Sequence, residues 1–106
     1  MCGICGFVTT RGGEGEIGEI LVAMNRAIAH RGPDGEGFYR DCFADGGGAA
    51  LGHRRLAIID LVTGDQPLFN ETRDLAIVFN GEIYNFDALR RELLAKGHRF
   101  VSTGDT

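Results

Sequence analysis

The stretch MCGICGFVT, residues 1–9, is the starting point for interpreting the fold. Apolar side chains recur along it with the spacing of an extended chain, which predicts a β-strand over residues 3–9. In such a strand Cys2 and Cys5 lie on opposite faces, because successive side chains alternate across a sheet. The sequence therefore opens with a strand that separates its two thiols.

The next segments alternate between helical and extended patterns. Residues 16–30 repeat apolar side chains at helical spacing, and a glycine-proline pair then stops the helix. Strands are expected near 36–43 and 49–60, separated by a glycine turn at 46–48. The apolar stripe of the helix consists of Ile17, Ile20, Leu21, Met24 and Ile28.

The second half of the chain continues this mixture. The run LAIVF, residues 75–79, is apolar throughout and predicts a strand covered on both faces. A helix is expected over 86–96, capped by Asn85 and closed by Gly97, with a short strand near 98–102. This order of elements predicts an α+β fold, with a mainly antiparallel sheet and helices packed on it.

Composition limits the classes of function. The 106 residues make one domain at most, and 43% hydrophobic with 25% charged residues is ordinary for a soluble globular protein. A net charge of -4 and the lack of a basic stripe argue against a nucleic-acid partner. No apolar run approaches the roughly 18 residues of a membrane span, and no secretory leader is recognisable. The expectation is a soluble, cytoplasmic protein.

Cys2 has the chemistry of an N-terminal nucleophile if Met1 is removed. The thiolate is the reactive form of cysteine, and most free thiol is protonated at neutral pH, so a base is needed. A free α-amine titrates close to neutral pH and can take that proton, directly or through a water. One residue would then supply both nucleophile and base.

Other readings of Cys2 remain open on the sequence alone. With Cys5 it forms a C-x-x-C spacing, which also occurs in redox pairs and in half of a zinc site. Cys42 and the three histidines offer no second ligand pair at a matching spacing, so no metal is expected. A cysteine at this position is also commonly a small buried hydrophobe. Three irregularly spaced cysteines predict free thiols.

Six segments, in the same order along the chain, carry a resemblance that favours the nucleophile interpretation of Cys2 over the other two. They are MCGICGF, AHRGPDGEG, GHRRLAIIDL, GDQPL, FNGEIYNFDALRREL and STGDT. Together they resemble the N-terminal-nucleophile glutaminase domain of class II glutamine amidotransferases, most closely the asparagine synthetase branch, to which RGPDG and NGEIYN point. The resemblance covers essentially the whole chain. It implies the αββα sandwich of the N-terminal-nucleophile hydrolases, with residues 1–106 as its N-terminal portion and the synthetase domain absent.

The resemblance implies catalytic roles for Cys2, Asn80 and Gly81. The Cys2 thiolate would attack the carboxamide of glutamine, release ammonia and leave a γ-glutamyl thioester. The side-chain amide of Asn80 and the backbone N–H of Gly81 would stabilise the oxyanion. Without the resemblance, Asn80-Gly81 is typical of an ordinary hairpin turn.

The same resemblance implies a glutamine-binding set. Arg55 would hold the α-carboxylate, which its planar fork matches bidentately. Glu82 and Asp105 would hold the α-ammonium, and the backbone of Leu56 and Ile58 would line the pocket. The alternatives are a solvated arginine, solvent-facing carboxylates, or a helix cap at Asp105.

The remaining expectations concern cofactors, partners and departures from the pattern. The resemblance implies no cofactor in this chain, with ATP and Mg expected only for the synthetase domain. L-Glutamine would be the substrate, that synthetase domain would belong to the same polypeptide and convert aspartate to asparagine, and the full-length protein would be a homodimer. A related enzyme amidating another carboxylate and an inactive truncated fragment are the alternatives. Cys5 replaces a small residue of the family pattern and would add a second reactive thiol near the site. The histidines His30, His53 and His98 are expected to be structural and satisfied by partners.

Overall fold

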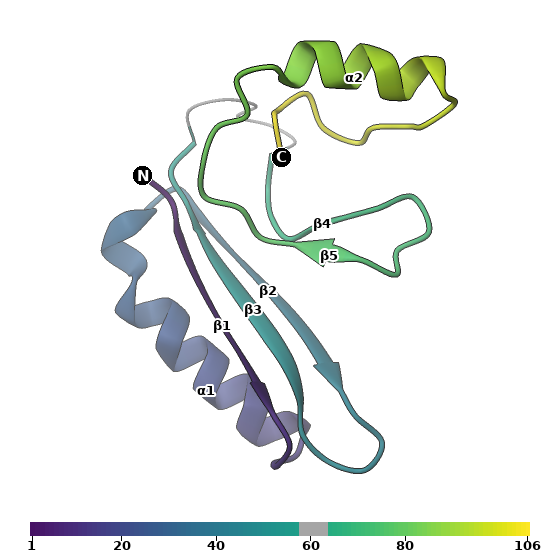
Figure 1. Ribbon diagram of the computed structural model, residues 1–106. Helices are drawn as coiled ribbons and strands as arrows, with labels where there is room; N and C mark the ends of the chain where they lie inside the picture. The colour runs from purple at the N-terminus through teal and green to yellow at the C-terminus, as the bar shows by residue number, and fades with distance from the viewer. Residues whose placement is uncertain (58–63) are drawn as a thin grey trace.

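A computed structural model describes residues 1–57 and 64–106 and shows an α+β fold around a three-stranded antiparallel sheet (Figure 1). Strand β3 (Gly48–Arg55) is central, between β1 (Gly3–Thr9) and β2 (Gly35–Cys42). These three predicted strands are confirmed. Both chain ends lie at the end of the sheet where β1 begins (Figure 1).

Strand β3 is shorter than the sequence predicted. It ends at Arg55, and the next two residues are not in a strand, while 58–63 lie outside the described residues. Gly3 pairs with Arg54 across the sheet, so the residue before β1 lies beside the end of β3. This register brings the N-terminus to the point where β3 leaves the sheet.

Helix α1 (Glu14–Ala27) covers one face of the sheet (Figure 1). Ile17 and Leu21 are buried against Ala50 of β3, and they form the hydrophobic core with half-buried neighbours from β1. The predicted stripe is wrong at Ile20, which is 43% exposed. The helix turns this side chain away from the sheet. A short 3-10 helix, η1 (Ala29–Arg31), follows α1, so the predicted helix over 16–30 ends early.

A polar network also lies on the α1 face. Asn25 is fully buried, and its amide donates to Glu36 Oε2 over 3.4 Å and accepts from the thiol of Cys5 over 3.9 Å. Glu36 in turn pairs with Arg54 at 2.6 Å, and Arg54 Nε donates to the carbonyl of Gly32. Because both amide atoms of Asn25 have a partner, burying this side chain avoids the cost of unpaired polar atoms.

On the opposite face of the sheet, a small hairpin of β4 (Leu68–Phe69) and β5 (Ala76–Ile77) contacts β2. Its Phe69 ring meets Tyr39 of β2 edge to face, with centroids 5.9 Å apart. Gly37 of β2 allows the chain before the hairpin to approach closely, since a Cβ there would lie 1.7 Å from the carbonyl oxygen of Gln66. The absence of a side chain at Gly37 therefore brings residues 66–67 against the sheet.

The predicted buried strand over residues 75–79 is wrong in extent and burial. Only Ala76–Ile77 are in a strand, and Leu75 is 68% exposed. The hairpin has two strands, so its apolar side chains are not enclosed between two layers of the described residues. An apolar run of residues indicates a hydrophobic segment, but it does not show whether other elements of the fold cover that segment.

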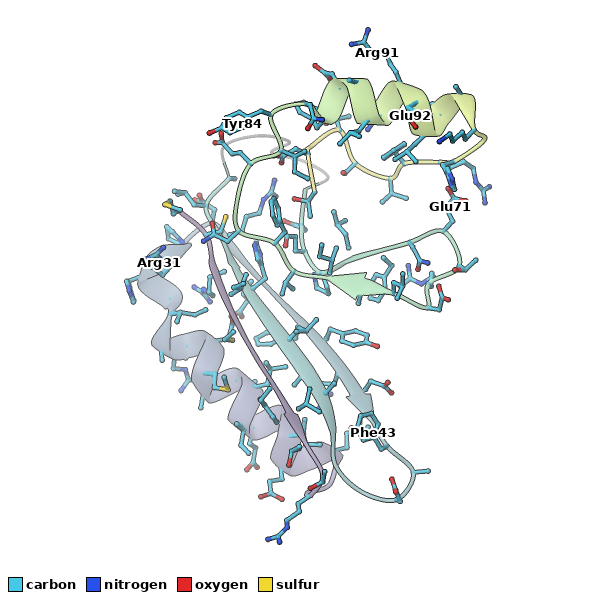
Figure 2. The ribbon with its side chains drawn as sticks, viewed as in Figure 1. Arg31, Phe43, Glu71, Tyr84, Arg91 and Glu92 are labelled. Carbon is cyan, nitrogen blue, oxygen red and sulfur yellow. The ribbon has the colours of Figure 1, made fainter. Side chains whose placement is uncertain are left out.

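Helix α2 (Phe86–Ala95) is confirmed, whereas the strand predicted near 98–102 is not found. Gly97 closes α2 with φ of 91°, a conformation that glycine adopts readily. The following segment returns to the hairpin, where Glu71 Oε1 accepts from the N–H of Arg99 over 2.7 Å (Figure 2). Side-chain contacts, rather than sheet pairing, hold these residues.

Candidate functional site

A cavity of about 440 Å³ lies on the face of the sheet opposite α1, at the end where β1 begins. Each predicted site residue in the described ranges lines it: Cys2, Arg55, Leu56, Asn80, Gly81, Glu82 and Asp105. Ile58 belongs to 58–63 and lies outside the described residues. Segments that are distant in sequence thus meet around one space.

The strand register holds Cys2 at this cavity. Leu56, one residue beyond β3, donates its N–H to Cys2 Sγ over 3.3 Å, and the thiol donates to the Leu56 carbonyl over 3.6 Å. These two contacts fix the sulfur beside the point where the chain leaves β3. The geometry suits a sulfur nucleophile at the cavity wall.

Cys5 lies on the other face, so the expected second reactive thiol near the site is wrong. Its sulfur faces Asn25 beneath α1, and Gly52 packs against it. Burial raises the pKa of the Cys5 thiol, and a backbone hydrogen bond at Gly52 offsets part of this effect. A half-buried thiol with a raised pKa is less nucleophilic at neutral pH. The opposite orientations of Cys2 and Cys5 also argue against a redox pair or a shared metal ion.

Arg55 ends β3 and is buried, with 7% of its surface exposed. Its Nη1 atom lies 2.6 Å from Oδ1 of Asp65, whose side chain is exposed. The alternative of a solvated surface arginine is therefore wrong. A guanidinium in a cavity wall offers planar, paired N–H donors to a carboxylate.

The loop after β5 and the last residues of the chain form the other wall. Asp105 Oδ2 accepts from the N–H of Ile83 over 2.7 Å, which joins the two segments. Glu82 is exposed and lines the same wall. Gly81 lies so close to the Phe79 ring that a Cβ would be 2.8 Å from it. This wall therefore combines two carboxylates with the Asn80-Gly81 backbone.

Comparison with known proteins identifies the family. A family model described as a glutamine amidotransferase domain matches residues 1–106. The chain belongs to the glutamine amidotransferase domain family. Asparagine synthetase (glutamine-hydrolyzing) 1 of Bacillus subtilis (strain 168) is 47% identical over 88 residues, which are 83% of this chain and 13% of that relative. Asparagine synthetase (glutamine-hydrolyzing) 3 of Arabidopsis thaliana is 40% identical over 107 residues, or 99% of this chain and 17% of the relative. The chain thus spans less than a fifth of these relatives' length.

In this glutamine amidotransferase domain, His53 lies at the cavity, a position that the sequence did not predict. It is 1% exposed and lines the cavity, and neither ring nitrogen makes a hydrogen bond with a described residue. Burial lowers the pKa of His53. A backbone contact with Phe79, which falls short of hydrogen-bond geometry, raises it, Arg55 lowers it further, and the charge of Asp65 raises it. The expectation of a partner-satisfied histidine is wrong here, although His98 does contact Glu71 at 3.1 Å.

Strand alternation contains a signal that could have found His53. It stands two residues before Arg55 in β3, so both side chains leave the same face of the sheet. Assigning Arg55 to a site therefore places His53 in or beside it. A neutral imidazole brings one donor and one acceptor to that position.

Gln66 and Tyr84 also line the cavity of this glutamine amidotransferase domain without having been assigned a role. Gln66 contacts the backbone of Phe79 at both its N–H and its carbonyl. Tyr84 is 93% exposed. Figure 2 shows it on the loop that leads into α2. Contacts between segments that are distant in sequence leave no periodic pattern from which they could be predicted.

Two absences concern only the residues that the structure describes, 1–57 and 64–106. Within them, no group of three or more histidine, cysteine, aspartate or glutamate side chains is arranged to hold a metal ion. Their helices are also too short or too polar to cross a membrane.

Proposed function

We propose that this domain hydrolyses L-glutamine to glutamate and ammonia, with Cys2 as the nucleophile after removal of Met1. The observation that carries the proposal is the position of Cys2 Sγ on the same cavity as Asn80, Gly81 and Arg55. Membership of the glutamine amidotransferase domain family supports it, as do relatives named glutamine-hydrolyzing asparagine synthetases.

The reaction proceeds in two steps. The α-amine of Cys2 takes the thiol proton, and the thiolate attacks the carboxamide carbon of glutamine. Asn80 and Gly81 donate to the oxyanion, the proton passes to the leaving nitrogen, and ammonia departs from a γ-glutamyl thioester. Water then attacks the thioester, which regenerates the thiol and yields glutamate. The thiol and the amine together supply this chemistry, so we propose no cofactor in this chain.

Arg55, Glu82 and Asp105 bind the amino-acid part of glutamine in this proposal. Arg55 has five N–H donors, so it can hold the substrate α-carboxylate while it keeps a contact with Asp65. The carboxylates of Glu82 and Asp105 attract the α-ammonium. The backbone of Leu56 borders the substrate, and Ile58 is proposed to do so as well.

In the complete protein, we propose that a synthetase domain in the same polypeptide uses the ammonia. It would amidate aspartate with ATP and Mg. The relatives' name, asparagine synthetase (glutamine-hydrolyzing), supports asparagine as the product. Another carboxylate acceptor is the alternative within the same reaction class. The complete glutaminase domain would be an αββα sandwich, in a homodimeric cytoplasmic protein.

The test is glutamate release from glutamine by the complete natural polypeptide and by its Cys2→Ala variant. We expect the variant to retain the fold and to lose glutaminase activity to background, because the thioester cannot form. The matched control is Cys42→Ala, which removes an exposed thiol distant from the cavity and keeps the activity. Glutaminase activity that survives in Cys2→Ala would contradict the proposal.

A further inference from the structure

We infer that Gln66 is a positioning residue, whose side-chain amide fixes the Asn80-Gly81 backbone opposite Cys2. This inference rests on the proposed function and adds a residue that does not touch the reacting atoms. It concerns how the cavity keeps its shape, since oxyanion donors act only when they are already aimed at the developing charge.

The amide of Gln66 pairs with both backbone groups of one residue. The N–H of Phe79 donates to Gln66 Oε1 over 2.5 Å, and Gln66 Nε2 donates to the Phe79 carbonyl over 3.1 Å. This arrangement gives Phe79 the two hydrogen bonds that a neighbouring strand would give. Phe79 immediately precedes Asn80, so the pairing sets the point from which the Asn80-Gly81 turn departs.

Gln66 also reaches the C-terminal segment. Its Nε2 atom donates to Thr106 Oγ1 over 3.4 Å. Thr106 follows Asp105, whose carboxylate accepts from the N–H of Ile83 in the loop beyond Gly81. One amide thus connects the two segments of this wall: the Phe79 backbone before the Asn80-Gly81 turn, and the C-terminal segment that carries Asp105.

The sheet fixes Gln66 in turn. The Gln66 carbonyl lies where a Cβ on Gly37 would be, so the segment rests directly on the β2 backbone. The adjacent Tyr39–Phe69 ring contact holds the start of the hairpin to the same strand. Gln66 is therefore anchored to the rigid three-stranded sheet, while its amide supports loops that have no regular secondary structure.

The geometry requires a glutamine rather than another polar residue. Glutamate would direct a carboxylate oxygen at the Phe79 carbonyl and at the Thr106 hydroxyl, and it would lose both donors. Methionine has a similar length and flexibility but offers no N–H donor and only a weak acceptor. Each substitution breaks the pairing and keeps the bulk of the side chain.

The test compares Gln66→Glu and Gln66→Met with the unmutated complete polypeptide. Removing one oxyanion donor typically costs about 10²–10³ in kcat, so displacing such donors should lower kcat by about tenfold or more. We expect kcat to fall by a larger factor than KM rises. The rate at which iodoacetamide, which does not need the oxyanion donors, alkylates Cys2 should change by less than about twofold. Hydrogen exchange at the Phe79 amide should accelerate, because its acceptor is lost or misplaced.

Asn70→Asp is the matched control. Asn70 is an amide on the same hairpin, its Oδ1 atom accepts from the N–H of Leu75 over 3.0 Å, and it does not line the cavity. The change makes the same amide-to-acid replacement at the far end of the hairpin. We expect it to lower stability while leaving kcat unchanged.

The outcomes separate this inference from the proposed function. If both Gln66 variants keep kcat within about twofold of the unmutated enzyme, or if Asn70→Asp loses as much kcat as they do, the inference is overturned. An equal loss of kcat and of Cys2 alkylation would also overturn it, because it would indicate general unfolding. If the unmutated protein releases no glutamate, the proposed function itself fails and the inference fails with it.

Discussion

The two faces of the three-stranded sheet differ in whether their buried polar side chains have hydrogen-bond partners. Under α1, the buried amide of Asn25 is paired with Glu36 and packs beside the apolar contacts of Ile17 and Leu21. On the cavity face, the equally buried ring of His53 has no hydrogen-bond partner among the described residues. Satisfied polar groups stabilise a fold, whereas unsatisfied ones beside a cavity indicate a place for a ligand or water.

A single strand serves both faces. In β3, Ala50 and Gly52 pack toward α1, while His53 and Arg55 line or border the cavity. Because side chains alternate along a strand, successive residues of β3 belong in turn to the packed face under α1 and to the cavity face. Substitutions that act on one face only should separate stability from activity.

The largest effect on stability is expected from Leu21→Ala on the α1 face. Leu21 is 1% exposed in the core, so the substitution removes buried contacts and leaves a cavity. We expect the free energy of unfolding to fall by about 2–5 kcal/mol, measured by urea denaturation. The control is Ile20→Ala on the same helix, where a side chain that is 43% exposed should cost far less. Equal losses in the two variants would contradict the assignment of the core to one stripe of α1.

Asn80→Ala should have the converse effect on the cavity face. We expect kcat for glutamine hydrolysis to fall by about 10²–10³, the usual result of losing one oxyanion donor. The free energy of unfolding should change little, since Asn80 lies in a loop outside the hydrophobic core. Steady-state kinetics and urea denaturation of the same preparation measure both quantities. A variant with full kcat would remove Asn80 from the proposed oxyanion hole.

The smallest effect is expected from the pH dependence of His53. Burial lowers the pKa of His53 in the folded chain below its ordinary value of 6.5. As the pH falls below that value, the unfolded chain takes up a proton that the folded chain resists, so the free energy of unfolding decreases. His53→Gln, which cannot titrate in this range, should flatten that part of the profile between about pH 7.5 and about pH 5.5.

The control for this prediction is His98→Gln, at an exposed histidine that contacts Glu71 away from the cavity. It should leave the His53-dependent decrease in place. If His53→Gln has the same pH profile as the unmutated protein, His53 is not the group that resists protonation on folding.

Local patterns explain which parts of the fold could be predicted. Alternation identified β1, and helical spacing identified the core residues Ile17 and Leu21, because these signals depend only on neighbours in sequence. The exposure of Leu75 was missed because the number of strands around it is a tertiary property. Strand β1 likewise placed Cys2 and Cys5 on opposite faces correctly, since alternation is a local rule.

The candidate site was predicted in part, and for a different reason. The resemblance to class II glutamine amidotransferases named Arg55, Asn80 and Asp105, and the structure brings them to one cavity, although their roles remain predictions. Gln66 and His53 were missed, because their position depends on which segments meet across the sheet. A hydrogen bond between residues 66 and 79 leaves no periodic trace in the sequence.

The most direct test is the intact mass of the complete polypeptide before and after exposure to an electrophilic glutamine analogue. We expect loss of Met1 and one adduct on Cys2, which excess glutamine blocks. Cys5, on the α1 face, should remain unmodified in the folded protein. Retention of Met1, or an adduct that forms on Cys5 rather than on Cys2, would contradict the claim that the cavity face carries the nucleophile.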